Sequence, residues 1–420
     1  MSIQSEIDRI RANVAGAYSA VEEMGGAVPQ QQTSANLAAA VRSIPSASGT
    51  PLDPAEVYRA TRPAGWLPMP EPQDNEMYLL FHIPDGASAL LAFTVTCTGP
   101  YTVALGTAAN GQFVQQSAVS LSSGRKYEAE LLADDWGGLT SDGFKQVMVK
   151  VSGTDILTWE PSTHSKKTAP ANFSNWNIVE IACKLPKGTK VACGIYREVS
   201  ALQQLKYFSW YGQNALTSAN YMFQYCYSLI AVLQLDISKL TSMYYLFSYC
   251  TSLIALPQLN TSKVTDMYST FSHCHSLAKI PLFDTSKTTR MYNTFNSCYS
   301  LITIPPLLTS QITSMYGMFE NCRSLIAVPQ LDICQVSEMT RTFSGCYSLG
   351  AVTFAPSESA GANISLADCS LGHQALVDLI DSLPTVTAAR TLTVTGSPGA
   401  AELTDTEQAV AAGKNWTVTL

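Results

Sequence analysis

The chain has 420 residues, of which 46% are hydrophobic and only 14% are charged, and its formal net charge is −7. This length allows roughly two to four domains. The acidic balance argues against nucleic acid as a partner. No apolar run is long enough to cross a bilayer, so we expect no membrane partner. The N-terminal stretch Met-Ser-Ile-Gln-Ser-Glu-Ile-Asp is acidic and amphipathic, so we expect no secretion signal.

Residues 1–47 are predicted to form a helical leader. Apolar residues in its first half recur at alternating intervals of four and three positions, which is the heptad spacing of a coiled coil. β-branched residues at both core positions favour a three-stranded assembly, so we predict a homotrimer. An ordinary amphipathic helix packed on its own chain is the alternative. The oligomerisation residues in this prediction are Ile3, Ile7, Ile10, Val14 and Val21.

Residues 48–195 have a different pattern, in which short runs of strand-forming residues alternate with turn residues. Runs of this kind occur at 77–83, 89–97, 146–151 and 178–183, and Pro, Gly and Asp are frequent between them. Many short strands with such turns are typical of a β-sandwich, here of the jelly-roll kind. We therefore predict a β-sandwich as the middle domain.

Residues 196–360 are organised by a repeat of 24 residues. Each full unit carries a Phe three positions before a Cys and a Leu three positions after it. Such a period predicts a solenoid, in which equivalent side chains of stacked coils form continuous columns. We expect the cysteines to be a structural core of buried thiols, with disulfides between neighbouring coils as the alternative. They are Cys226, Cys250, Cys274, Cys298, Cys322 and Cys346.

One repeat unit is predicted to contain two segments. The apolar run 253–256 ends at Pro257, which suits a short strand. Val264, Met267 and Phe271 fall at helical spacing, which predicts one or two helical turns or a tight irregular equivalent. The pattern resembles the BspA-type leucine-rich repeats of bacterial surface proteins. This resemblance implies a solenoid that binds proteins or glycans and that is not an enzyme.

Residues 361–420 keep the period but change its content, because helical patterns at 371–383 and 403–412 each precede a strand-like run. We interpret this region as an α/β cap that closes the solenoid. The expected fold is therefore a mixed multidomain one. It combines an N-terminal coiled-coil helix, a jelly-roll-like β-sandwich middle domain and a C-terminal leucine-rich-repeat solenoid with an α/β cap.

The two ends of the sequence resemble tail and fibre proteins from phages of Gram-positive hosts. The segments that carry this resemblance are "IQSEIDRIRANVAGAYSAVEE", within the leader, and "LTDTEQAVAAGKNWTVTL" at the C-terminal end. The resemblance implies that the N-terminal helix attaches to other tail or baseplate proteins. It also implies a location in the virion, in a tail tip or fibre.

The sequence offers no catalytic set, no metal site and no cofactor motif, and we expect none. His273 and His275 flank Cys274, but this cysteine belongs to the repeated core column. Two surface columns are candidates for binding, because aromatic side chains serve protein and sugar ligands alike. The alternative is that stacked tyrosines only cover the coils. One column contains Tyr244, Tyr268, Tyr292 and Tyr316, and the other contains Tyr227, His275, Tyr299, Arg323 and Tyr347.

The predicted function is that of a non-enzymatic phage tail fibre or receptor-binding protein. Its solenoid is expected to recognise a bacterial surface protein or glycan. A bacterial cell-surface adhesin with the same solenoid is one alternative, and the missing secretion signal counts against it. A carbohydrate-active sandwich domain is a second alternative, and the lack of a suitably placed pair of acidic residues counts against it.

Overall fold

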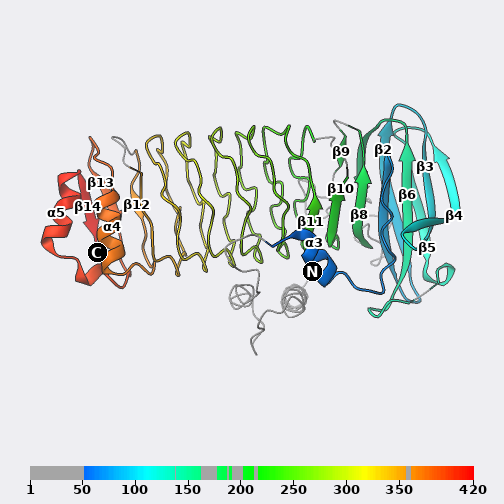
Figure 1. Ribbon diagram of the computed structural model, residues 1–420, viewed down its shortest axis with the longest axis horizontal. Helices are drawn as coiled ribbons and strands as arrows, with labels where there is room; N and C mark the ends of the chain where they lie inside the picture. Colours follow the sequence, from blue (N-terminus) through cyan, green and yellow to red (C-terminus); the bar gives the residue numbers. More distant parts are fainter. Residues whose placement is uncertain are drawn as a thin grey trace, which may run out of the picture. The chain divides into compact units, whose positions relative to one another are not determined.

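In the computed structural model of the protein, the described residues are 52–137, 139–161, 177–186, 189–191, 202–211, 216–355 and 361–420. Residues 53–240 form one compact unit, and 241–420 belong to a second one (Figure 1). The domain boundaries predicted from the sequence stay predictions. The predicted helical leader lies outside the described residues, and so do its oligomerisation residues Ile3, Ile7, Ile10, Val14 and Val21.

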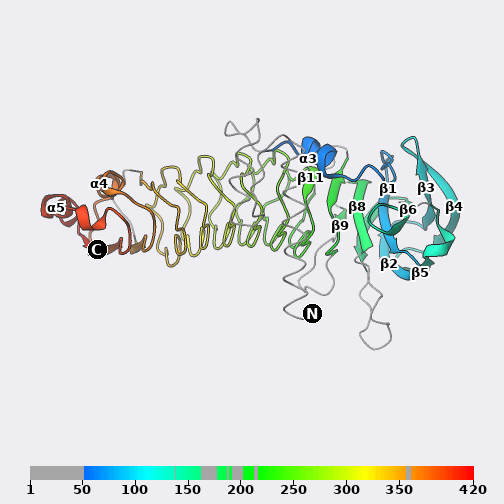
Figure 2. The ribbon, with the colours of Figure 1, turned by 90° about the horizontal axis from the view of Figure 1, so that it is seen from below.

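The unit 53–240 contains two β-sheets (Figure 2). The larger sheet has the strand order β11-β10-β8-β1-β6-β3-β4, and the smaller one has the order β5-β2-β7-β9. The strands are β1 (Glu76–Pro84), β2 (Ser88–Cys97), β3 (Tyr101–Ala109), β4 (Gln112–Leu121), β5 (Lys126–Leu132), β6 (Phe144–Gly153), β7 (Ile156–Pro161), β8 (Ile178–Lys184), β9 (Lys190–Val191), β10 (Tyr207–Trp210) and β11 (Ala231–Gln234), with a 3-10 turn η1 (Ala133–Asp135) after β5.

The larger sheet changes from antiparallel to parallel pairing at β8. On one side of β8, strands β1, β6, β3 and β4 pair in antiparallel fashion. On the other side, β10 runs parallel to β8, and β11 runs parallel to β10 with Tyr207 opposite Ala231. These two partners are 24 positions apart, which is one repeat. The first repeat unit therefore extends the antiparallel sheet by parallel pairing.

Helix α3 (Pro54–Thr61) packs against the β8 side of this sheet through a buried carboxylate. Asp53 caps the helix by accepting a hydrogen bond from the Ala55 amide at 2.9 Å. Glu180 on β8 accepts hydrogen bonds from the Tyr58 hydroxyl at 2.7 Å and from Arg62 Nε at 2.8 Å. Burial raises the pKa of Glu180, and Arg62 opposes that rise. The partners make it possible to bury this acid.

One stretch of each coil in 241–355, such as 243–249, has a backbone pattern that repeats every two residues. The amides of Met243, Tyr245 and Phe247 donate to carbonyls of the next coil at 2.9, 3.0 and 2.8 Å. The alternate amides, those of Leu246 and Ser248, donate instead to the carbonyls three residues earlier in their own coil. Two positions in each coil have positive φ. They are occupied by Tyr245, Tyr249, Ser269, His273, Asn293, Ser297, Gly317, Asn321, Arg341 and Gly345.

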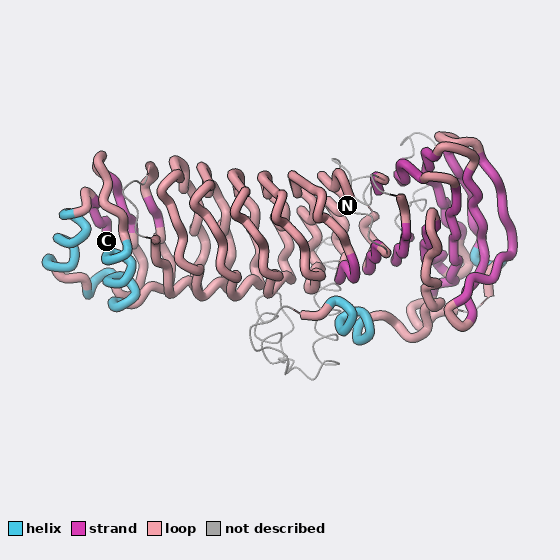
Figure 3. Tube along the Cα trace, turned by 45° about the horizontal axis from the view of Figure 1, so that its top comes forward, coloured by secondary structure: helices cyan, strands magenta, loops and turns pink. Residues whose placement is uncertain are grey.

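The predicted mixed fold is therefore wrong. The described residues are mostly β, and their only α-helices are three short ones, α3, α4 (His373–Ser382) and α5 (Asp405–Gly413). The coils form a β-solenoid rather than leucine-rich-repeat units of strand and helix, and Figure 3 draws most of each coil as loop. Two left-handed residues four positions apart in each coil are incompatible with a helix there, and alternate amides bond to the next coil instead. The predicted coiled coil lies outside the described residues, and none occurs within them.

Two buried columns fill the inside of these coils. The rings of Phe247, Phe271, Phe295, Phe319 and Phe343 stack with centroid separations of 5.5, 5.7, 5.7 and 5.9 Å. Beside them, the thiol of Cys298 donates to the carbonyl of Phe271 at 3.1 Å, and Cys274, Cys322 and Cys346 make the equivalent bond. All six predicted core cysteines, including Cys226 in the first unit, are buried and free.

Residues 361–420 close the second unit with helices and parallel strands (Figure 1). Strands β12, β13 and β14 pair in parallel, and α4 and α5 precede β13 and β14 in the chain. No helix within the described residues has the length and apolar character needed to span a bilayer. The elements are β12 (Ile364–Ser365), α4 (His373–Ser382), β13 (Arg390–Thr393), η4 (Ala400–Glu402), α5 (Asp405–Gly413) and β14 (Trp416–Thr419).

Candidate functional site on the solenoid coils

The predicted tyrosine column forms a continuous ladder of half-buried rings. Tyr268 stacks on Tyr244 at 5.0 Å and on Tyr292 at 4.8 Å, and Tyr292 stacks on Tyr316 at 4.5 Å. Burial, together with the neighbouring tyrosines, raises the pKa of the Tyr268 and Tyr292 hydroxyls. Both faces of these two middle rings are covered by their neighbours. The ladder therefore offers hydroxyl groups and ring edges to a ligand, not the ring faces on which sugars stack.

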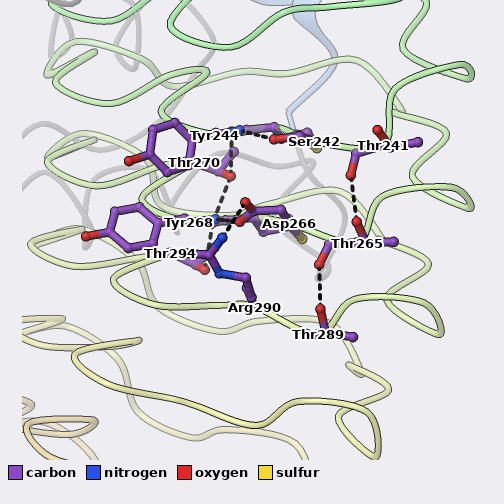
Figure 4. Close-up of polar contacts among 12 residues, drawn as sticks. Thr241, Ser242, Tyr244, Thr265, Asp266, Tyr268, Thr270, Thr289, Arg290 and Thr294 are labelled. Atoms are coloured by element: carbon purple, nitrogen blue, oxygen red, sulfur yellow. Dashed lines mark hydrogen bonds and ion pairs between the residues drawn. The ribbon is translucent and has the colours of Figure 1, made fainter.

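Side-chain caps hold this ladder in register. The amide of Tyr268 donates to Asp266 Oδ1 at 3.0 Å, and the amide of Tyr244 donates to Ser242 Oγ at 3.3 Å (Figure 4). Arg290, one coil further, forms an ion pair with Asp266 at 3.2 Å. These short polar side chains fix the turn before each tyrosine.

A column of threonines runs along the same part of the coils. The hydroxyl of Thr265 donates to the Thr241 carbonyl at 3.1 Å, and the hydroxyl of Thr289 donates to the Thr265 carbonyl at 3.3 Å (Figure 4). The donors are thus engaged with the backbone of the preceding coil. We conclude that this face mainly stabilises the stack.

The second predicted column is not one continuous surface. Tyr227 is buried in the unit 53–240. In the second unit, His275 stacks on Tyr299 at 4.4 Å, and the Arg323 guanidinium lies 4.7 Å from the Tyr299 ring centroid. Tyr347 is 55% exposed. Arg323 and Tyr347 are therefore the members of this column that are open to a ligand.

A groove that the sequence interpretation missed crosses the coils on another face. Its volume is about 790 Å³, and it lies in the second unit. Leu282 and Leu308 form its apolar part and are 57% and 60% exposed, which makes them the most exposed large hydrophobic side chains among the described residues. The lining residues are Gln258, Leu259, Asn260, Thr261, Ser262, Leu282, Phe283, Asp284, Ser286, Pro306 and Leu308.

Leu308 occupies a position that is polar in the other coils. Asp236, Asn260, Asp284 and Asp332 stand there, and each accepts a hydrogen bond from the amide two residues later, at 2.9 to 3.2 Å. These bonds are Asx turns, which hold the polar bend of each coil. Leu308 cannot accept this bond and exposes an aliphatic side chain instead. The fold therefore does not explain why a leucine stands at this position.

Leu282 breaks a second polar column. The equivalent positions hold Gln258 and Gln330, whose amide groups donate to carbonyls of the following coil at 2.6 and 3.1 Å. Leu282 cannot make such a bond, and Pro306 follows it in the same column. The groove is therefore made where two polar columns change to apolar residues in neighbouring coils. This deviation from the repeat was visible in the sequence.

Burial keeps the Cys274 thiol and the His273 ring in their neutral forms. The Cys274 thiol is fully buried and donates to the Phe247 carbonyl at 3.2 Å, and burial raises its pKa far above the ordinary range. Burial also lowers the pKa of His273 to about 4, so this ring is neutral near pH 7. No group of three or more His, Cys, Asp and Glu side chains in the described part of the chain is placed to hold a metal ion.

The comparisons with known proteins concern the repeat. A family model described as "Mycoplasma protein of unknown function, DUF285" matches residues 192–303, 217–325 and 241–352. No curated protein matches the chain. The repeat and the solenoid coils fit a surface repeat protein, which is the general part of the resemblance drawn from the sequence.

Proposed function

We propose that this protein is a non-enzymatic binding protein whose solenoid groove recognises a protein on a bacterial surface. The observation that carries the proposal is the pair of exposed leucines, Leu282 and Leu308, at positions that are polar elsewhere in the repeat. Exposed aliphatic side chains in a groove lose unfavourable contact with water when an apolar partner covers them.

The chemistry of the groove favours a protein over a glycan. Its open walls are aliphatic, and its one aromatic lining residue, Phe283, is buried. Polar groups lie at the rim, where Asp284 Oδ1 already accepts hydrogen bonds from Ser286, and these bonds lower the pKa of Asp284. An apolar centre with a polar, anionic rim suits an apolar side chain of a partner protein flanked by hydrogen-bond donors.

The finer form of the proposal is host attachment by a phage tail fibre or tail tip. It is supported by the resemblance of residues 1–47 and of the C-terminal stretch to phage tail and fibre proteins. In that setting the protein is part of the virion, and its leader contacts other tail or baseplate proteins. Electron microscopy of particles labelled with an antibody against 361–420 tests this form. Label on bacterial cells but not on particles would favour an adhesin.

Binding to Gram-positive cells tests the groove itself. We expect fluorescently labelled protein to bind intact cells, and we expect protease treatment of the cells to remove the binding sites. The variant Leu308→Asp restores the residue type of the other coils, so it should fold normally and bind at least about tenfold more weakly.

A matched control separates the groove from a general loss of apolar surface. Leu157 is 45% exposed on β7, outside the solenoid coils of the second unit. Leu157→Asp should leave cell binding unchanged. Equal binding by the wild type and Leu308→Asp would refute the groove as the binding site. Binding that survives protease treatment of the cells but is lost when their wall polysaccharide is removed would refute a protein partner.

A further inference from the structure

The unit 53–240 contains a small pocket that the solenoid proposal does not use. Its volume is about 260 Å³, near the lower end of the roughly 300–1,000 Å³ typical of ligand sites. It lies where the loop after α3 meets residues at or near the ends of β1, β6, β8 and β10. The lining residues are Trp66, His82, Asp142, Phe144, Asn177, Val179, Gln204 and Lys206.

The pocket has aromatic walls that are firmly positioned. The Trp66 and His82 rings meet edge to face at 4.8 Å, and His82 stacks on Phe144 at 5.4 Å. Gln146 fixes the loop that carries Trp66, because its side chain accepts from the Leu67 amide and donates to the Gly65 carbonyl, each at 2.8 Å. The backbone on both sides of Trp66 is thus fixed by hydrogen bonds. A site that is fixed before the ligand arrives loses less entropy on binding.

Two buried ring nitrogens in these walls have no partner. Trp66 and His82 are 4% and 5% exposed, and neither Trp66 Nε1 nor His82 Nε2 forms a hydrogen bond within the described part of the chain. Buried polar atoms are satisfied in the great majority of cases. Both residues that carry these nitrogens line the pocket.

A cation lies in the same pocket without an anion bonded to it. Lys206 Nζ is 5.2 Å from the Trp66 ring centroid, and among the described residues it forms no ion pair. Burial lowers the pKa of Lys206. The nearby Asp142 carboxylate opposes that shift but forms no ion pair with Lys206. An anionic group bound beside Lys206 would balance its charge.

We propose that this pocket binds a sugar acid, a single hexuronate-like ring whose carboxylate pairs with Lys206. Phe144, which is half-buried, offers aromatic surface to the apolar face of a sugar ring. Asn177, Gln204 and Asp142 line the pocket and offer donors and acceptors for its hydroxyls. The pocket volume accommodates one ring but not a long chain.

Calorimetric titration of the full chain tests the ligand class. Glucuronate and galacturonate serve as probes, and glucose, galactose, acetate and inorganic phosphate serve as comparisons. We expect at least one uronate to bind about tenfold or more tightly than every comparison compound. Equal binding of the neutral sugars would overturn the pairing with Lys206. Equal binding of acetate or phosphate would overturn the sugar.

Three variants assign any binding to this pocket. Lys206→Met should weaken uronate binding about tenfold or more without lowering the melting temperature, because it removes a poorly compensated buried charge. Phe144→Leu removes aromatic surface from the pocket and should weaken binding less. Lys190→Met is the control, since Lys190 is an exposed lysine of the same unit that pairs with Glu160 at 3.7 Å.

The stability measurement distinguishes a binding role from a structural one. If Lys206→Met lowers the melting temperature and the wild type binds no uronate, Lys206 is structural and the proposal is overturned. Uronate binding that persists in Lys206→Met would place the site elsewhere and would also overturn it. Neither result bears on the solenoid groove, which lies in the other unit.

Discussion

The two units solve the problem of buried polar groups in different ways. In the coils of 241–355 the thiol of Cys298 finds its acceptor in the coil before it, and the same bond recurs at Cys274 and Cys322. Before its first repeat coil, the unit 53–240 has no neighbouring copy to supply partners, and Trp66 Nε1 and His82 Nε2 have none among the described residues. A few buried hydroxyls of the coils, such as Ser248 Oγ, also have none. In a repeat, a candidate functional residue is one that differs from the equivalent residues of the other coils. In a non-repeating unit, a candidate site is a pocket lined by polar or charged groups that lack partners within the protein.

The largest test removes one ring from the phenylalanine stack. Phe295→Ala should lower the free energy of unfolding by about 3–5 kcal/mol, because the rings of Phe271 and Phe319 above and below it keep the cavity open. Chemical denaturation measures this loss, and exposed Leu308→Ala is the control. A loss below about 1 kcal/mol would mean that the coils collapse around the gap, so that the column is not a cooperative core.

A second test breaks the isolated buried ion pair of the first unit. Arg62→Met leaves the Glu180 carboxylate buried without its cation, and we expect a loss of about 3 kcal/mol or more. Arg59→Met, at an exposed arginine of the same helix, is the control. The double variant Arg62→Met with Glu180→Gln should recover part of the loss. No recovery would show that Arg62 acts through packing rather than through its charge.

The periodic part of the fold was predictable because one signal was repeated many times. The columns of Phe295 and Cys298 were expected to be internal, and both residues are fully buried. The helices and strands of 371–420 lie close to their predicted positions, since caps and periodicity mark them locally. The helical interpretation of Met267 and Phe271 was less successful. Spacing alone cannot distinguish a helix from turns with left-handed residues, which depend on hydrogen bonds to the next coil.

The sites were harder to predict than the fold. The four tyrosines were expected to share one column and their rings stack, but sequence cannot show that Tyr268 and Tyr292 cover each other's faces. Leu308 could have been found, because it replaces an Asp or Asn of the repeat. The pocket around Trp66 and Lys206 could not, since its residues come from segments more than a hundred positions apart that only the sheet brings together.

A third test asks how much the thiol hydrogen bond of the coils contributes. Cys298→Ala removes the donor and leaves only a small cavity, so we expect a loss of about 1–2 kcal/mol in the free energy of unfolding. The effect is small because the Phe271 carbonyl also accepts from the Cys274 amide at 3.1 Å. Cys298→Ser, which keeps a donor, is the matched variant. A loss as large as that of Phe295→Ala would show that the thiols, not the rings, dominate the column.

The smallest test concerns the end of the second unit, where the repeat gives way to single contacts. Glu407 on α5 accepts hydrogen bonds from the Thr404 amide at 2.7 Å, from His373 Nε2 on α4 at 3.0 Å and from the Thr404 hydroxyl at 2.8 Å. The Thr404 amide and His373 contribute most to lowering the pKa of Glu407 from its ordinary 4.5 to about 2.

The sign of the pH dependence follows from this lowered pKa. Above the ordinary value of 4.5 the folded and unfolded forms are both ionised, and the carboxylate contributes its full stabilisation. As the pH falls from 4.5 towards 2, the unfolded form takes up the proton first, so this stabilisation is lost. Glu407→Gln should therefore make unfolding less dependent on pH in that window, as measured by thermal unfolding at several pH values. Glu402→Gln, at an exposed acid in η4, should leave the dependence as it is in the wild type. If the Glu407 variant keeps the full dependence, the contact between the two helices does not act through this charge.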